Sequence, residues 1–134
     1  MIQRHTTPPS LAELENIAAI EFERIPDELR RHLGAILFRI EEFPDEETEG
    51  EMDLESPFDL LGLYRGVHLG HKTTGLVAND VDMIFLYRRP ILDEWCASGE
   101  ALPALIRQVL IHEIGHHFGL SDDDMARIEG EAAD

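Results

Sequence analysis

A short segment near the end of the chain, His112-Glu113-Ile114-Gly115-His116-His117, follows a long apolar run. We expect a helix over residues 100–118 that ends at Gly119, because glycine readily adopts the left-handed conformation common after a helix. At about 100° per residue, Leu105, Val109, His112 and His116 share one side of this helix. The apolar residues Leu110, Ile114 and Phe118 lie on the opposite side. A helix that is apolar on nearly all sides is packed between other elements. Its histidines then face the interior or a cleft, a costly place unless something binds them.

Several shorter elements are expected before this helix. In chain order they are a helix over 11–25, a short helix after Pro26, strands over 35–40, 60–64 and 83–87, and a helical turn around Leu92–Cys96. Ser10 and Glu13 fit a capping box at the start of the first helix. The glycine-bearing segment between the last two strands forms a long loop or a loose hairpin. We expect one domain over residues 10–134, preceded by a flexible arm over 1–9.

The chain is strongly acidic, with 28 acidic and 11 basic side chains among 134 residues and a formal charge of -17. Such a surface repels the phosphates of nucleic acids and anionic membranes, so we expect neither as a partner. Residues 41–57 concentrate acidic side chains and predict a solvated acidic loop. Recruitment of a cationic partner by this loop is an alternative to a plain charged surface.

The sequence also bears on the compartment. The N-terminus lacks the apolar region of a secretory signal, and no stretch approaches the roughly 18 apolar residues of a membrane span. The single cysteine, Cys96, has no partner within the chain for a disulfide, which fits a reducing compartment. We therefore expect a cytoplasmic protein, with Cys96 as a small buried residue and Trp95 in the core.

The two outer histidines of the segment have the spacing of a metal site. His112 and His116 are separated by one helical turn, which places both imidazoles on one side, where they can hold a single ion. Zinc accepts nitrogen ligands and tetrahedral geometry. Glu113 follows the first histidine and can take a proton from water, the pattern of helical metalloprotease signatures. The alternative is a buried helix whose histidines bond backbone carbonyls.

A catalytic zinc ion needs a third protein ligand and one free position. Three residues after His116 comes Gly119, where the chain can turn sharply, and three residues later comes Asp122, whose carboxylate can reach back. Asp123 and Asp124 are neighbours that could take this place. A shuffled sequence contains the His-Glu-x-x-His pattern roughly one time in twenty, and the added glycine and aspartate lower this to roughly a few in ten thousand.

The segment 112–122, together with residues 61–67 and 86–90, resembles the small bacterial zincin-like metallopeptidases, also called minimal zincins. The resemblance covers roughly residues 10–125 and is most specific in the C-terminal third. It implies an α+β fold in which N-terminal helices and a small mixed sheet of about three strands pack on a C-terminal metal-binding helix. A Met-turn of the metzincin kind is not evident, so the resemblance to true metzincins is partial.

The resemblance also implies a zinc-dependent metallopeptidase. Zn²⁺ is then held by His112, His116 and Asp122, and Glu113 is the general base in the hydrolysis of a peptide or protein substrate. The substrate is expected to lie along a strand edge, for which Met83–Leu86 is our candidate. The alternative is a zinc- or peptide-binding module that has the same site but little or no proteolytic activity, because so short a chain has little material for pocket walls.

Other polar side chains have weaker claims. His117 lies about 100° from His116 on the helix, so we expect it to support the site or to face solvent. His68 and His71 lie in the predicted loop and are most simply exposed. Four further side chains are candidates for stabilising an oxyanion, although core packing and surface charge explain them as well: Tyr64, Tyr87, Arg88 and Arg89.

Overall fold

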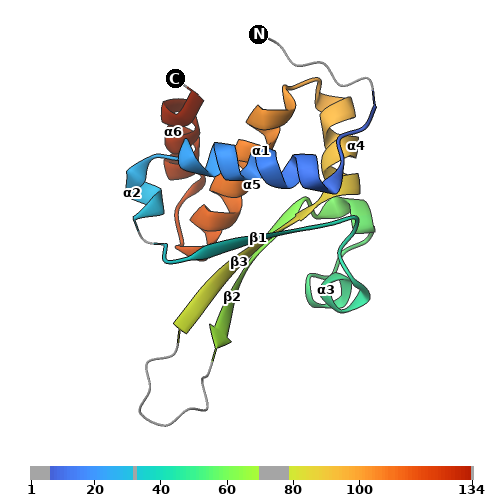
Figure 1. Ribbon diagram of the computed structural model, residues 1–134, viewed down its shortest axis with the longest axis horizontal. Helices are drawn as coiled ribbons and strands as arrows, with labels where there is room; N and C mark the ends of the chain where they lie inside the picture. Colours follow the sequence, from blue (N-terminus) through green and yellow to red (C-terminus); the bar gives the residue numbers. More distant parts are fainter. Residues whose placement is uncertain (1–6, 32, 70–78, 134) are drawn as a thin grey trace.

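A computed structural model of the chain describes residues 7–31, 33–69 and 79–133. These residues form six α-helices, one short 3₁₀-helix and a three-stranded sheet (Figure 1). In chain order the elements are α1 (Leu11–Glu23), α2 (Asp27–Arg30), β1 (Ile36–Glu41), α3 (Glu46–Glu51), η1 (Pro57–Asp59), β2 (Gly62–Leu69), β3 (Asn79–Tyr87), α4 (Arg88–Ser98), α5 (Leu102–His117) and α6 (Asp122–Ala133). The expected α+β class is confirmed. The expected arm over 1–9 lies mostly outside the described residues.

The sheet has the strand order β1-β3-β2, so β3 is the central strand. β1 runs parallel to β3, and β2 pairs with it antiparallel in a register that sets Gly62 opposite Leu86. The expected mixed sheet is therefore confirmed, and the two later strands pair as a hairpin. Met83–Leu86 lies within the central strand, hydrogen-bonded on both sides, so the expectation that it offers a free edge is wrong. Among the described strands, β1 and β2 form the edges.

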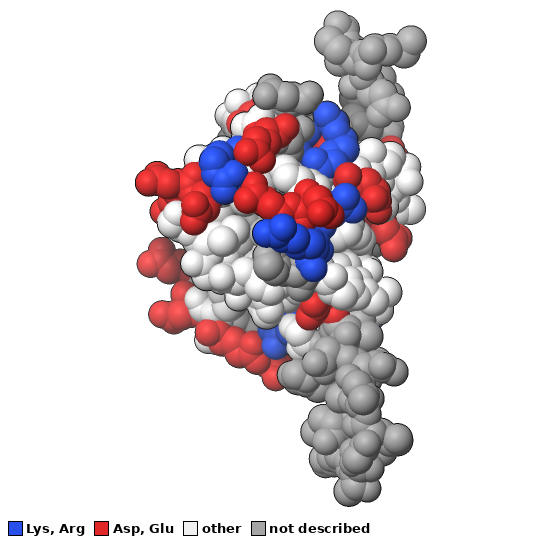
Figure 2. Space-filling model, turned by 90° about the vertical axis from the view of Figure 1, so that its left-hand side faces the viewer, with Lys and Arg blue, Asp and Glu red and all other residues white. Residues whose placement is uncertain are grey.

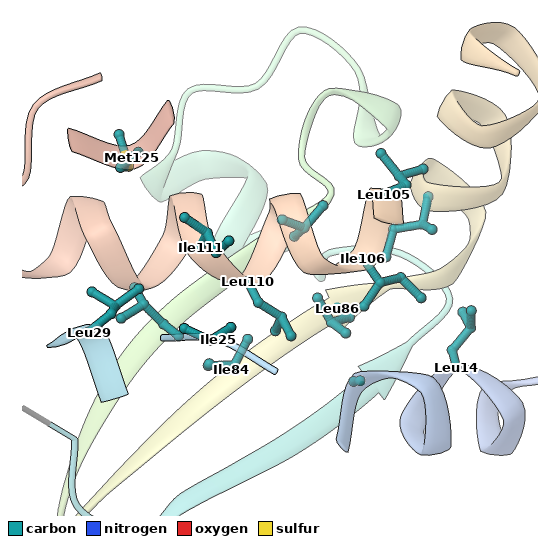
Figure 3. Close-up of a cluster of buried hydrophobic side chains, with 14 of the residues drawn as sticks. Leu14, Ile25, Leu29, Ile84, Leu86, Leu105, Ile106, Leu110, Ile111 and Met125 are labelled. Carbon is teal, nitrogen blue, oxygen red and sulfur yellow. The ribbon is translucent and has the colours of Figure 1, made fainter. Parts of the chain in front are cut away.

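Helix α5 lies at the centre of the fold, as its apolar periodicity predicts. Ile106 and Leu110 point from α5 toward Ile84 and Leu86 of β3, while Met125 of α6 lies on the opposite side of the helix (Figure 3). All five side chains are fully buried, and each contributes roughly 1.5–3 kcal/mol by leaving water. The helices α1, α5 and α6 gather on one side of the sheet, and the distal part of β2 and β3 extends away from them (Figure 1).

Two glycines allow other elements to approach α5 closely. A Cβ atom at Gly62 would lie 2.8 Å from Val109 Cγ1, so β2 touches α5 at this point. A Cβ atom at Gly115 would lie 2.5 Å from Met125 Sδ, so α6 packs directly on the α5 backbone. Contacts this short leave no room for a side chain at either position.

A buried ion pair joins α1 to α5. Glu21 is 3% exposed, and its carboxylate accepts a 2.7 Å hydrogen bond from Arg107, whose side chain is 12% exposed. Arg24 approaches the other carboxylate oxygen at 3.3 Å from a half-exposed position. Burial of a charge is costly unless it is paired and hydrogen-bonded, so this glutamate depends on its arginines.

The acidic segment is more ordered than the sequence indicates. Helix α3 begins after Asp45, whose carboxylate accepts a 2.7 Å hydrogen bond from the Thr48 N–H. The side chain of Thr48 is buried, and the 3₁₀-helix η1 begins at Pro57, the last residue of the segment. The expectation of a solvated loop over 41–57 is therefore wrong for α3. A side-chain cap of this kind stabilises a helix by about 1 kcal/mol.

Two other expectations fail near the later helices. Helix α6 has no counterpart in the elements expected from the sequence, although Met125 and Ile128 bury its apolar side. Cys96 is an exposed free thiol and not a buried residue, because it lies on the outer side of α4. Trp95 packs partly buried against the core, as expected.

The surface carries both signs of charge. Acidic side chains spread over the face in Figure 2, and basic side chains lie among them. One such pair links α6 to α2, since Arg127 lies 2.8 Å from Glu28. Among the described residues, no helix combines the length and the apolar character that crossing a lipid bilayer requires.

Candidate active site

One side of α5 lines an open cleft of about 420 Å³. The cleft is lined by Leu105, Val109, His112 and His116, the four residues that the helical periodicity places on one side, and by Glu113. Leu105 and Val109 lie in the earlier turns of α5, and the three polar residues follow toward its C-terminus. The cleft therefore brings the predicted base together with both predicted histidine ligands.

The two histidines stand one turn apart at the cleft. Their ring centroids are 6.1 Å apart, and the ring planes are inclined by 83°. The His112 side chain is 46% exposed, and His116 is exposed as well. Both imidazoles are thus accessible from solvent, and within the described parts of the chain no backbone carbonyl bonds either ring.

Glu113 is more enclosed than either histidine. Burial raises the pKa of its carboxyl, while the charge of His116 and a hydrogen bond from the Tyr64 N–H act in the opposite direction. A raised carboxyl pKa is the usual condition of a glutamate that exchanges protons near neutral pH. Glu113 is therefore the side chain in the cleft best suited to carry a proton.

The Tyr64 N–H belongs to the free edge of β2. The Tyr87 N–H donates to the Leu61 carbonyl at 2.9 Å, which makes Leu61 and Tyr87 a hydrogen-bonded pair. In an antiparallel ladder such pairs alternate with pairs whose backbone groups point outward, so Tyr64 points its N–H away from β3. This outward N–H is one of the groups that lower the pKa of Glu113, so the edge strand and the predicted base are neighbours.

Helix α6 adds a carboxylate that the sequence did not indicate. Glu129 Oε1 lies 2.6 Å from His112 Nε2. The same oxygen is buried and lacks a hydrogen bond of acceptable alignment within the described structure. A buried carboxylate oxygen without such a bond is costly, so a further partner at this position would stabilise it.

The predicted third ligand lies elsewhere. Asp122 is the exposed first residue of α6, and Asp123 beside it is also exposed. Asp124 is engaged in the helix cap, where its N–H donates to Ser121 Oγ at 3.1 Å. Within the described parts of the chain, no three His, Cys, Asp or Glu side chains are arranged to hold one ion. The assignment of Asp122 as a ligand stays a prediction.

The other candidate side chains have structural roles. His117 stacks on Tyr64 with a centroid separation of 4.0 Å and an interplanar angle of 25°. Burial, together with the negative charge of Asp82, raises the pKa of the Tyr64 phenol. Arg88 donates to the Pro9 carbonyl at 2.6 Å and so fixes the chain before α1. His71 lies outside the described residues.

The donor atoms at this cleft suit zinc. Two imidazoles one turn apart and a carboxylate form a mixed nitrogen and oxygen set that zinc accepts in catalytic sites. The unsatisfied Glu129 Oε1 beside His112 Nε2 is the structural observation that a cation would explain. The two histidines therefore fit the metal that the sequence motif predicts, while no third side chain of the described residues completes the set.

The chain is a small α+β protein whose central helix, α5, carries the His-Glu-x-x-His motif at a cleft. The family model described as zincin-like metallopeptidase matches residues 33–132, and the chain therefore belongs to the zincin-like metallopeptidase family. The matched region contains the whole sheet, α5 and nearly all of α6. No curated protein matches the chain. The family resemblance inferred from the sequence is thus confirmed.

Proposed function

We propose that the protein is a zinc-dependent peptidase that hydrolyses peptide bonds. His112 and His116 bind the ion, and the sequence motif offers Asp122 as the third ligand. When bound, zinc polarises the scissile carbonyl and lowers the pKa of water. The observation that carries the proposal is the half-buried Glu113, with its raised pKa, beside two histidines in an open cleft.

Glu113 is the general base in this proposal. Its carboxylate takes a proton from the attacking water and passes it to the leaving amine, the two transfers that peptide hydrolysis requires. Burial raises the pKa of this carboxyl, and the opposing effects of His116 and the Tyr64 N–H are smaller, so the environment favours the protonated form that gives a proton to the amine.

The free edge of β2 is the proposed site for an extended substrate. The alternation that points the Tyr64 N–H outward also directs the backbone groups of Gly62 and Gly66 to this edge. A peptide strand added there passes the cleft that contains Glu113, because Gly62 lines the same cleft. Strand addition supplies affinity through backbone hydrogen bonds and leaves the choice of side chains to the cleft walls.

The cleft walls favour cationic substrate side chains. Asp59, Glu94 and Glu100 line the cleft, and none of its described lining residues is a lysine or arginine. Because a cleft lined by one sign of charge raises the local concentration of the opposite sign, we propose peptides with basic residues near the scissile bond as substrates. The reducing cytoplasm is the proposed compartment, since the exposed thiol of Cys96 has no disulfide partner.

Digestion of a broad peptide library by the zinc-loaded protein, with and without a chelator, tests this proposal. Cleavage that the chelator abolishes supports a peptidase. A protein that binds zinc and peptides without cleaving them is the alternative, a binding module. The limited volume of the cleft, about 420 Å³, favours this alternative, because it offers few walls to position a long substrate.

A further inference from the structure

We propose that Tyr64, on β2, is a positioning residue that holds the last turn of α5, and with it His116, in place for metal binding. The proposal rests on the proposed function only in that His116 binds the ion. It gives a part in the site to a side chain that does not line the cleft and lies outside the His-Glu-x-x-His motif.

Three aromatic rings meet where the end of α5 approaches β2. The Tyr64 and His117 rings stack, with centroids 4.0 Å apart and planes inclined by 25°. The Phe118 ring meets both of them edge-on, at centroid distances of 6.5 Å from Tyr64 and 5.0 Å from His117. Ring pairs with these geometries stabilise a contact beyond the area that they bury. The cluster therefore attaches the end of α5 to the sheet.

The last turn of α5 is closed by backbone hydrogen bonds of its own. The Gly119 N–H donates to the His116 carbonyl at 3.1 Å, and the Leu120 N–H donates to the Gly115 carbonyl at 2.9 Å. This is the Schellman pattern of a helix end, and its bonds do not reach the sheet. Because His116 is exposed, the stack made by the next residue, His117, is a contact that fixes the turn relative to β2.

Tyr64 is itself firmly held. Its backbone pairs with Ile84 of the central strand, and its ring packs against the buried core. Its phenol oxygen is buried, and Asp82 is close enough to raise the pKa of the phenol. The backbone N–H of the same residue lies near the Glu113 carboxyl, whose pKa it lowers. One residue of β2 thus neighbours both the predicted base and the turn that carries a predicted ligand.

Tyr64→Leu and Tyr64→Phe separate the effect of the ring from that of the hydroxyl. Leucine removes the stack, so we expect zinc affinity, measured by competition with a chromophoric chelator, to fall about three- to tenfold. Hydrogen exchange at the Gly119 and Leu120 amides of the metal-free protein should quicken by a similar factor, because the turn opens more readily. Phenylalanine keeps the ring and should restore both measurements to within about twofold of the wild type.

Leu63→Ala is the matched control for a general loss of stability. Leu63 is half-buried and adjacent to Tyr64 in β2, and neighbouring residues of a strand point to opposite faces of the sheet. We expect this variant to unfold at a lower urea concentration, while its zinc affinity stays within about twofold of the wild type. An equal loss of zinc affinity in Leu63→Ala and Tyr64→Leu would reduce Tyr64 to a role in folding and overturn the proposal.

Substitutions of His117 test the stack from its exposed partner, where folding is least at risk. His117→Ala should reproduce the loss of zinc affinity, and His117→Phe should reverse it, because phenylalanine stacks without an imidazole. Wild-type zinc affinity in folded Tyr64→Leu and His117→Ala variants would overturn the proposal. An equal loss in His117→Phe and His117→Ala would also overturn it, since the imidazole and not the stack would then matter.

Failure of this inference is distinguishable from failure of the proposed function. If the protein cleaves peptides in a zinc-dependent manner while Tyr64→Leu binds zinc normally, the peptidase stands and the positioning role fails. If Tyr64→Leu weakens zinc binding, Tyr64→Phe restores it and no peptide is cleaved, the positioning role stands and the peptidase fails.

Discussion

The backbone N–H of Tyr64, on the edge strand β2, lowers the pKa of the Glu113 carboxyl on α5 and so acts on the predicted base. Gly62, two residues earlier in β2, makes this approach possible, because a Cβ atom there would lie 2.8 Å from Val109 Cγ1 of α5. The packing of β2 on α5 is therefore part of the site.

Because Met125 lies directly against Gly115, any side chain larger than glycine at position 115 should destabilise the protein. Gly115→Ala would place Cβ 2.5 Å from Met125 Sδ, and Met125 is fully buried, so its side chain or α6 itself must shift. We expect a loss of about 1–3 kcal/mol in the free energy of unfolding, measured by urea denaturation. Gly130→Ala is the matched control, because no atom lies within 4 Å of its added Cβ and α6 should gain about 0.5–1 kcal/mol. Equal effects of the two substitutions would contradict the account of α6 packing.

The ion pair between Glu21 and Arg107 predicts unequal effects for its two arginines. Arg107→Met leaves a buried carboxylate with the half-exposed Arg24 as its other partner, and we expect a loss of about 3 kcal/mol. Arg24→Met should cost under about 1 kcal/mol, because an exposed partner contributes little. Thermal and urea unfolding of both variants measure the difference. Similar losses would show that α1 does not depend on the buried contact.

Both tyrosines of the chain should ionise at a higher pH than an exposed tyrosine does. Burial raises the pKa of Tyr87 to about 12 and raises that of Tyr64 as well. The folded state favours the neutral phenols, so their contribution to stability is complete below pH 10, the ordinary value, and is lost as the pH rises toward 12. Phenolate absorbance should remain absent at pH 10 while circular dichroism reports a folded chain. Half-ionisation of either tyrosine at pH 10 in the folded protein would contradict this burial.

The acidic cleft predicts a preference among substrates. In a peptide library, we expect enrichment of lysine or arginine near the cleaved bond, and the preference should weaken as salt rises, because screening reduces the attraction. Glu94→Gln and Glu100→Gln should reduce the preference and leave zinc binding intact, since both glutamates line the cleft apart from the histidines. A preference for acidic residues in the same library would refute the electrostatic argument.

The sequence predicted the centre of the fold better than its margins. Helix α5 was predicted because its apolar residues recur with helical spacing, and burial against the sheet then follows from that pattern. The first strand was predicted within one residue at each end, but the two later strands were predicted too short, since β2 continues to Leu69 and β3 begins at Asn79. Those outer positions pair with one another along the two strands, from Gly66 opposite Asp82 to Leu69 opposite Asn79.

Helix α6 carried a signal that was not used. Ser121 and Asp124 form a reciprocal capping contact, and Met125 and Ile128 follow at helical spacing, yet three consecutive aspartates resemble a solvated tail. The contact of Glu129 with His112 is different in kind. It depends on how closely α6 approaches Gly115. That approach is set by tertiary packing, which a local sequence pattern does not predict.

The most direct test of the central claim is to measure zinc content and peptide hydrolysis together in Glu113→Gln. Glutamine keeps the shape of glutamate but cannot accept the proton from water. The account predicts a folded variant that retains wild-type zinc content and loses at least about a hundredfold in hydrolysis. Wild-type cleavage by the zinc-loaded variant would contradict the account.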